Sequence, residues 1–273
     1  MTLRTISYGG GVQSSALIVL AAQGKLQDVI GGELTAALFS NVGDDSEHPK
    51  TLTYVRDAMM PWATQNGVSV LELRKVDKYG NEITLLEKIS DPDRKFLKIP
   101  ARYPSGAPAS RHCTVDWKVR VLQKWLRENG ATPDDPAVVS IGISTDEYQR
   151  ANSKSSAKYE KRIFPLLELG MSRDDCIELI ANVGLQVPPK SSCYFCPFHT
   201  VKMWQEMRDN EPELFEKAAQ LEDILHMKSE KFGFKKLYLS RRVKPLREAF
   251  PAKEINEEEN FNDGECDSGF CWT

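Results

Sequence analysis

Most of the six cysteines stand where thiolates could bind a metal. Cys193 and Cys196 form a Cys-x-x-Cys pair followed by proline, a spacing at which two thiolates hold one tetrahedral centre, either zinc or an iron–sulfur cluster. Cys113 lies upstream, and Cys266 and Cys271 lie near the C-terminus. In a cytosolic chain, cysteines are more often metal ligands or redox groups than disulfides. We expect a metal centre held by Cys113, Cys193 and Cys196, with Cys266 or Cys271 as fourth ligand.

Cys176 fits a different role. It falls within an amphipathic pattern that also holds Ile177, Ile180 and Val183, with Ser172 as a helix cap. A free cysteine on the apolar face of a helix behaves as a small hydrophobic residue. We therefore expect Cys176 to lie in the core.

A second chemical signal is the glycine-rich stretch near the N-terminus. Three consecutive glycines separate a short β-branched segment, Thr5 and Ile6, from an apolar segment that begins at Ala16. Glycines at this junction let the backbone approach a ligand, and the N–H groups at a helix start bind phosphate. Serine hydroxyls at the helix start can cap it or bind phosphate oxygens. The predicted phosphate-binding residues are Ser7, Tyr8, Gly9, Gly10, Gly11, Gln13, Ser14 and Ser15.

The elements that must position these residues alternate between strand and helix. Short apolar runs at 36–40, 68–73 and 137–143 read as strands, and the segments 14–22, 51–66 and 115–129 have helical spacing. This order predicts an α/β fold, a doubly wound, mostly parallel sheet with helices on both faces. Ligands of such sheets bind at the carboxyl ends of the strands, where the loops 8–15, 41–48 and 144–150 are polar.

The second half of the chain has a different character. The residues after the cysteine pair predict a helix over 201–229, then a basic stretch from Lys228 to Arg247, an acidic linker and the cysteine-containing tail. We predict a nucleotide-binding domain at 1–190 and a helical region at 191–273. The basic stretch is either a solvated helix face or a track for a nucleic-acid backbone.

Charge and hydropathy limit the class of protein. The 273 residues carry a formal net charge of −3, which excludes a generally basic nucleic-acid binder. There is no run of about 18 apolar residues that would cross a membrane. The first residues lack the features of a secretion signal, so we expect a cytoplasmic protein without a membrane partner.

In combination, these motifs are recognisable. The glycine loop, the loop at Asn41, the Arg-x-Cys-Thr of Arg111 to Thr114, the Asp-Glu pair at Asp146, and the Cys-x-x-Cys-Pro-Phe that begins at Cys193 occur in one order. Together they resemble the phosphoadenylyl-sulfate reductase family of the adenine-nucleotide alpha-hydrolase superfamily, also called PP-loop proteins. The resemblance runs from about Thr5 to the C-terminus.

The resemblance implies a Rossmann-like (HUP-type) fold. It also implies an adenine nucleotide, which is ATP, AMP or a sulfonucleotide, bound over the carboxyl edge of the sheet next to a 4Fe–4S cluster. In this pattern Asn41, Gly43 and Asp44 border the adenosine. Asp146, Glu147 and Arg150 face the nucleotide or substrate. Cys266 matches the family's nucleophilic cysteine, which attacks the sulfur of the sulfonucleotide.

Three positions depart from the family pattern. Gly9 replaces a serine, and Gln13 replaces an aspartate that assists the magnesium–pyrophosphate unit in members that cleave ATP. The departure at Gln13 argues against cleavage of ATP, while magnesium remains a candidate ion. Thr114 stands where the family's iron–sulfur branch has a second cysteine, so either one iron is open or a tail cysteine completes the cluster.

Three functions fit these residues. The main hypothesis is an iron–sulfur enzyme that reduces or transfers sulfur next to a bound nucleotide. The first alternative is a PP-loop thiolase that modifies a nucleic acid with an open-iron cluster. The second alternative is a non-catalytic nucleotide-binding module with structural zinc. The electron or sulfur donor and the oligomeric state stay open.

Overall fold

A computed structural model describes residues 2–95, 98–153 and 157–251 of the chain. Contacts within it define two compact units. The first unit comprises residues 2–82 and 116–192, and the second unit comprises residues 83–115 and 193–251. The predicted division at residue 190 lies close to the boundary after Ser192. The segment Ile83–Val115, which the sequence places in the first domain, groups with the second unit instead.

The first unit is built on a five-stranded sheet in which all pairs are parallel. The strand order is β3-β2-β1-β4-β5. From β1 the chain continues outward through β2 to β3, and from the neighbouring β4 it continues outward to β5 on the opposite side. This arrangement confirms the predicted Rossmann-like fold and places a topological switch point between β1 and β4. The strands are β1 (Arg4–Tyr8), β2 (Ala36–Asn41), β3 (Val70–Arg74), β4 (Ala137–Ile141) and β5 (Glu160–Ile163).

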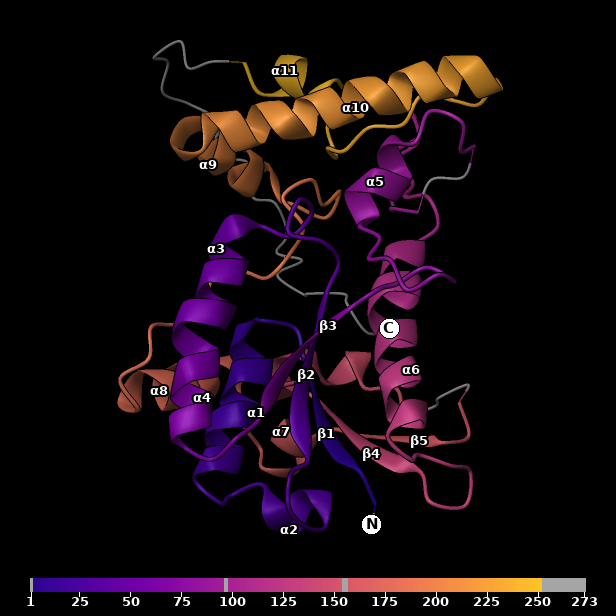
Figure 1. Cartoon of the computed structure of the whole chain (residues 1–273). Helices are drawn as coiled ribbons and strands as arrows, with labels where there is room; N and C mark the ends of the chain where they lie inside the picture. Colours follow the sequence, from indigo (N-terminus) through magenta and orange to yellow (C-terminus); the bar gives the residue numbers. More distant parts are fainter. Residues whose placement is uncertain (1, 96–97, 154–156, 252–273) are drawn as a thin grey trace. The chain divides into compact units, whose positions relative to one another are not determined.

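Helices cover both faces of this sheet (Figure 1). Alternating residues of β1 and β2 explain the two layers, because Ile6 and Phe39 pack into one apolar cluster and Ala36 and Leu38 into the other. Cys176 is fully buried in the first cluster, which confirms its predicted core role, and burial raises the pKa of its thiol to about 12. The helices of the unit are α1 (Val12–Ala22), α2 (Gln27–Ile30), α3 (Pro49–Thr53), the π-helix η1 (Tyr54–Met59), α4 (Met60–Gln65), the π-helix η2 (Thr114–Val119), α6 (Arg120–Glu128), the 3₁₀ helix η3 (Thr145–Arg150), α7 (Pro165–Glu168) and α8 (Arg173–Asn182).

The second unit is helical and packs around aromatic side chains. The rings of Trp204, Phe215 and Phe250 lie 6.4 to 6.5 Å apart, centre to centre. The predicted helix over 201–229 is two helices, because Pro212 lacks the N–H that an unbroken helix needs and begins a new one. Its helices are α5 (Leu85–Ser90), α9 (Val201–Asn210), α10 (Pro212–Phe232) and α11 (Leu246–Ala249). No helix in the described ranges has the length and apolar character needed to cross a membrane.

A buried carboxylate ties α10 to the segment that follows it. Glu222 is 1% exposed, and its two oxygens accept backbone N–H bonds from Leu239 at 2.7 Å and from Leu246 at 2.5 Å. Burial raises the pKa of Glu222 to about 7, although these hydrogen bonds lower it. The native state therefore binds this proton more tightly than the unfolded chain does, and the second unit loses stability as pH rises from about 4.5 to about 7.

Glu222→Gln should lower the free energy of unfolding by about 1–3 kcal/mol, because the amide leaves one buried backbone N–H without an acceptor. The stability gap between wild type and variant should narrow as pH rises, since only the wild type loses the contribution of the bound proton. Urea unfolding from pH 5 to pH 8 measures both effects. Glu213→Gln, at an exposed position of the same helix, is the control. A gap that widens with pH would contradict this account of Glu222.

Candidate functional site

The glycine loop joins the carboxyl end of β1 to the start of α1, beside the switch point of the sheet. Gly10 has a φ of +76°, and a Cβ there would lie 3.0 Å from Thr51 Cγ2. Only glycine combines that backbone conformation with such a close neighbour. Gly11 is the N-cap of α1, and in the described structure no side chain forms a capping hydrogen bond at this helix start. The first N–H groups of this helix are therefore available to an anion.

Serine hydroxyls shape this loop from inside. Ser14 Oγ accepts a hydrogen bond from Gly9 N–H at 3.2 Å and donates one to Gly11 O at 3.2 Å. Ser191 Oγ donates to Gly9 O from the other side. Ser15 is fully buried beneath the loop, where its hydroxyl lies 3.5 Å from that of buried Tyr8. These contacts give the predicted residues a role in the loop's shape, while their contact with phosphate stays a prediction.

Gln13, the residue that departs from the family pattern, lies next to a cation. Its Oε1 accepts a hydrogen bond of 3.4 Å from Arg173 Nη1. Arg173 is the first residue of α8, and its backbone N–H donates to Asp146 Oδ2 at 2.6 Å. Asp146 thus accepts the first backbone N–H of α8, whose N-cap is Ser172, and the helix places a guanidinium beside the glycine loop.

The other two residues predicted to face the substrate pair with each other. Arg150 Nη1 and Glu147 Oε2 form an ion pair whose side chains are 9% and 14% exposed. With Asp146 at the start of α8, the predicted group is engaged in contacts within the first unit. Its predicted role toward a substrate stays a prediction.

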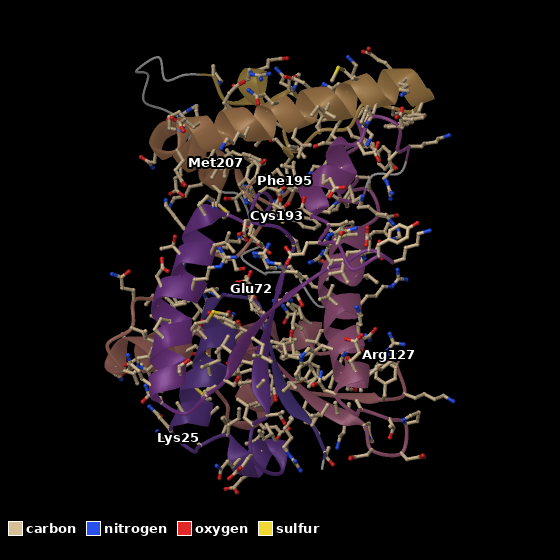
Figure 2. All side chains as sticks on the ribbon, viewed as in Figure 1. Lys25, Glu72, Arg127, Cys193, Phe195 and Met207 are labelled. Atoms are coloured by element: carbon tan, nitrogen blue, oxygen red, sulfur yellow. The ribbon has the colours of Figure 1, made fainter. Side chains whose placement is uncertain are left out.

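The loop after β2 is fixed by an ionic network. Asn41 Oδ1 accepts Gly43 N–H at 2.8 Å, and Asn41 Nδ2 donates to Asp44 and Glu72. Arg56 and Arg74 each lie 2.7 to 2.8 Å from both carboxylates, and Figure 2 labels Glu72 among them. Burial alone would raise the pKa of Asp44, but hydrogen bonds from Arg56 and Asn41 outweigh it and hold the pKa at about 2.

The sequence analysis did not single out two residues that the structure makes candidates for the site. Gly142 follows β4, and a Cβ there would lie 2.8 Å from Ser14 N and 2.9 Å from Gln13 C, which are backbone atoms of the first turn of α1. Glu47 is a buried carboxylate in the loop after β2, 3.6 Å from Lys118 Nζ. Neither belongs to a recognisable motif, although a glycine directly after a buried strand is a signal for close backbone packing.

The three described cysteines of the second unit, Cys113, Cys193 and Cys196, are all partly buried. Cys196 N–H donates to Cys193 O at 3.1 Å, which closes the knuckle, and Cys113 N–H donates to Lys98 O at 2.6 Å. The intervening Phe195 is fully buried and anchors the knuckle (Figure 2). These soft thiol donors fit zinc or an iron–sulfur cluster in chemical type.

The described residues do not form a complete ligand set. Within residues 2–95, 98–153 and 157–251, no group of three or more His, Cys, Asp or Glu side chains is placed to hold a metal ion. Cys266 and Cys271, the predicted fourth ligands, lie outside the described residues, as does the proposed nucleophilic role of Cys266. The ligand set therefore stays a prediction.

Four of the eight cationic side chains in the basic stretch pair with neighbouring acidic groups in the described structure. Lys228 is 2% exposed and donates to Ile89 O at 2.7 Å, and burial lowers the pKa of its ammonium group. Arg247 pairs with Glu216 and Asp223. This pattern matches a solvated helix face better than a continuous track for a nucleic acid. The further ion pairs are Lys231–Asp93, Lys236–Glu230 and Lys244–Glu248.

The comparisons with known proteins assign neither a family nor a function to this chain. No family model matches the chain, and no curated protein matches it. Among solved structures, it is similar to the U34-tRNA thiolase NcsA from Methanococcus maripaludis with its [4Fe-4S] cluster, at a TM-score of 0.45 and 14% identity over 95% of this chain and 84% of that chain. A likeness this low assigns no function.

Proposed function

We propose that this protein is an iron–sulfur enzyme that binds an adenine nucleotide on the Gly9–Ser15 loop and reduces or transfers sulfur. The observation that carries the proposal is the geometry of that loop. A left-handed Gly10, a helix of 11 residues with no side-chain cap, and a location beside the switch point are the features that phosphate binding requires.

The chain's own residues supply binding and orientation. The first N–H groups of α1 bind phosphate oxygens, and Arg173 adds positive charge beside them. Cys113, Cys193 and Cys196, with Cys266 or Cys271, would hold the cluster. When bound, a 4Fe–4S cluster supplies electrons or an iron site that binds sulfur. Reduction of a sulfonucleotide is the main candidate reaction, with Cys266 as nucleophile.

Thiolation of a nucleic acid is the second candidate, favoured by one observation in the second unit. Arg102 and Arg241 each carry an Nε that is buried and lacks a hydrogen-bond partner in the described part of the chain. Burial, together with the charge of Arg241, lowers the pKa of Arg102. Two neighbouring guanidiniums with open donors suit a phosphate of a nucleic acid.

Metal analysis of the anaerobically purified protein tests the cluster. We expect about four irons and four sulfides per chain. Cys193→Ala should lose them, and Cys176→Ala, which removes a core thiol, should keep them. Stoichiometric zinc without iron would contradict the proposal and favour the structural-zinc alternative.

Assays with different substrates distinguish sulfonucleotide reduction from nucleic-acid thiolation. Reduction predicts that the protein with a dithiol reductant releases sulfite from a sulfonucleotide, and that Cys266→Ser stops this release while the iron content is kept. Thiolation predicts sulfur incorporation into RNA or DNA that depends on Arg102 and Arg241. If the protein carries its cluster but neither releases sulfite nor incorporates sulfur into a nucleic acid, the proposed chemistry is refuted.

A further inference from the structure

Glu47 is buried without the hydrogen bonds that a carboxylate needs. Its side chain is 0% exposed, and both of its oxygens lack a hydrogen-bond partner among the described residues. Burying an unsatisfied carboxylate is costly, and such groups in native proteins call for an explanation. A bound ligand that donates hydrogen bonds would provide one.

Lys118 pairs with this carboxylate without giving its oxygens a hydrogen bond among the described residues. Its Nζ lies 3.6 Å from Glu47 Oε1, which is an ion pair but too long for a good hydrogen bond. The helix that carries Lys118 is fixed locally, because Ser40 Oγ donates to Lys118 O at 3.4 Å. Glu47 therefore presents two acceptor oxygens side by side, next to a positive charge.

The backbone places Glu47 close to the glycine loop. Strands β1 and β2 are neighbours, with Tyr8 opposite Phe39, and both loops leave the same edge of the sheet. Glu47 N–H donates to Gly43 O at 2.9 Å, and the next residue, His48, donates to Ser192 O at 3.1 Å. Ser191, adjacent to Ser192, donates to Gly9 O. A chain of direct contacts thus joins the Glu47 loop to the predicted phosphate site.

We propose that Glu47 binds the ribose of the nucleotide by accepting hydrogen bonds from its two vicinal hydroxyls. This inference rests on the proposed nucleotide function. A cis-diol offers two donors side by side, which matches two open carboxylate oxygens. The amino edge of adenine offers donors from a single nitrogen. Acidic residues near the end of the second strand bind ribose hydroxyls in dinucleotide-binding sheets as well. The neighbouring Asp44 is already engaged by Arg56 and Arg74.

Binding of ATP, 2′-deoxy-ATP and 3′-deoxy-ATP tests the proposal, measured by calorimetry on the full-length protein. The wild type should bind ATP at least about tenfold more tightly than either deoxy analogue, because each analogue lacks one charge-assisted hydrogen bond. Glu47→Gln should weaken ATP binding by about 10- to 100-fold and remove the preference for the diol. Glu33→Gln, an exposed position of the same unit, should behave as wild type.

The outcomes separate this inference from the function on which it rests. If the wild type binds none of the three nucleotides, the nucleotide function itself fails. If it binds all three equally, the ribose role of Glu47 is overturned while nucleotide binding stands. A thermal melt of Glu47→Gln checks its folding, and if that variant does not fold, the wild-type preference among the analogues decides the question.

Discussion

Replacing Gly142 with alanine should abolish nucleotide binding and destabilise the first unit by about 1–3 kcal/mol. The new Cβ would lie 2.8 Å from Ser14 N and 2.9 Å from Gln13 C. Both are backbone atoms, so no side chain can rotate to relieve the overlap, and the start of α1 must move away from β4. That movement displaces the N–H groups that the proposed phosphate site uses.

A thermal melt and a nucleotide titration of Gly142→Ala measure the two effects. Gly11→Ala is a matched control for stability, because its Cβ would have 3.9 Å to its nearest neighbour, Ser191, and Gly11 has a φ of −103°. It should keep the wild-type melting temperature. Wild-type affinity in Gly142→Ala would show that the contact between β4 and α1 does not position the site.

Arg173→Met should weaken nucleotide binding by about 10- to 100-fold, and chelation of divalent metals should have little effect on the wild type. The reason is that position 13 holds a neutral residue, Gln13, whose amide oxygen accepts a hydrogen bond from Arg173. A carboxylate at this position would attract magnesium, whereas the amide and guanidinium place a fixed positive charge on the protein itself. The hydrogen bond that Asp146 accepts at the start of α8 uses the backbone N–H of residue 173 and is kept in the variant.

Calorimetric titration with nucleotide, in the presence of magnesium or of a chelator, tests this prediction. Gln13→Asp should make binding depend more strongly on magnesium, because it introduces a carboxylate. Arg120→Met, at a side chain that is 67% exposed on α6, is the control for loss of a charge. If chelation abolishes wild-type binding, or Arg173→Met binds as wild type does, the fixed-charge explanation is wrong.

The sequence predicted the elements whose signal is local. The β-branched pair Thr5 and Ile6 located β1, and short apolar runs located β2, β3 and β4. The Ser172 cap located α8, because capping acts within a few residues. The sequence missed β5, whose residues Glu160 to Ile163 are mostly charged, since the edge position of this strand is a property of the sheet. It also missed α5, a helix of six residues with little periodicity to detect.

The residues of the candidate site also fall into those that the sequence predicts and those that only the tertiary structure reveals. By itself, the sequence determined the glycine loop, the thiol pair at Cys193 and Cys196, and the core role of Cys176, because each follows from residue type and short-range spacing. Only the tertiary structure decided that Gly142 packs on the backbone of α1 and that Glu47 is buried beside Lys118. These contacts join residues far apart in the chain, and they form because parallel strands bring their carboxyl ends to one edge of the sheet. No local pattern encodes which side chains meet there.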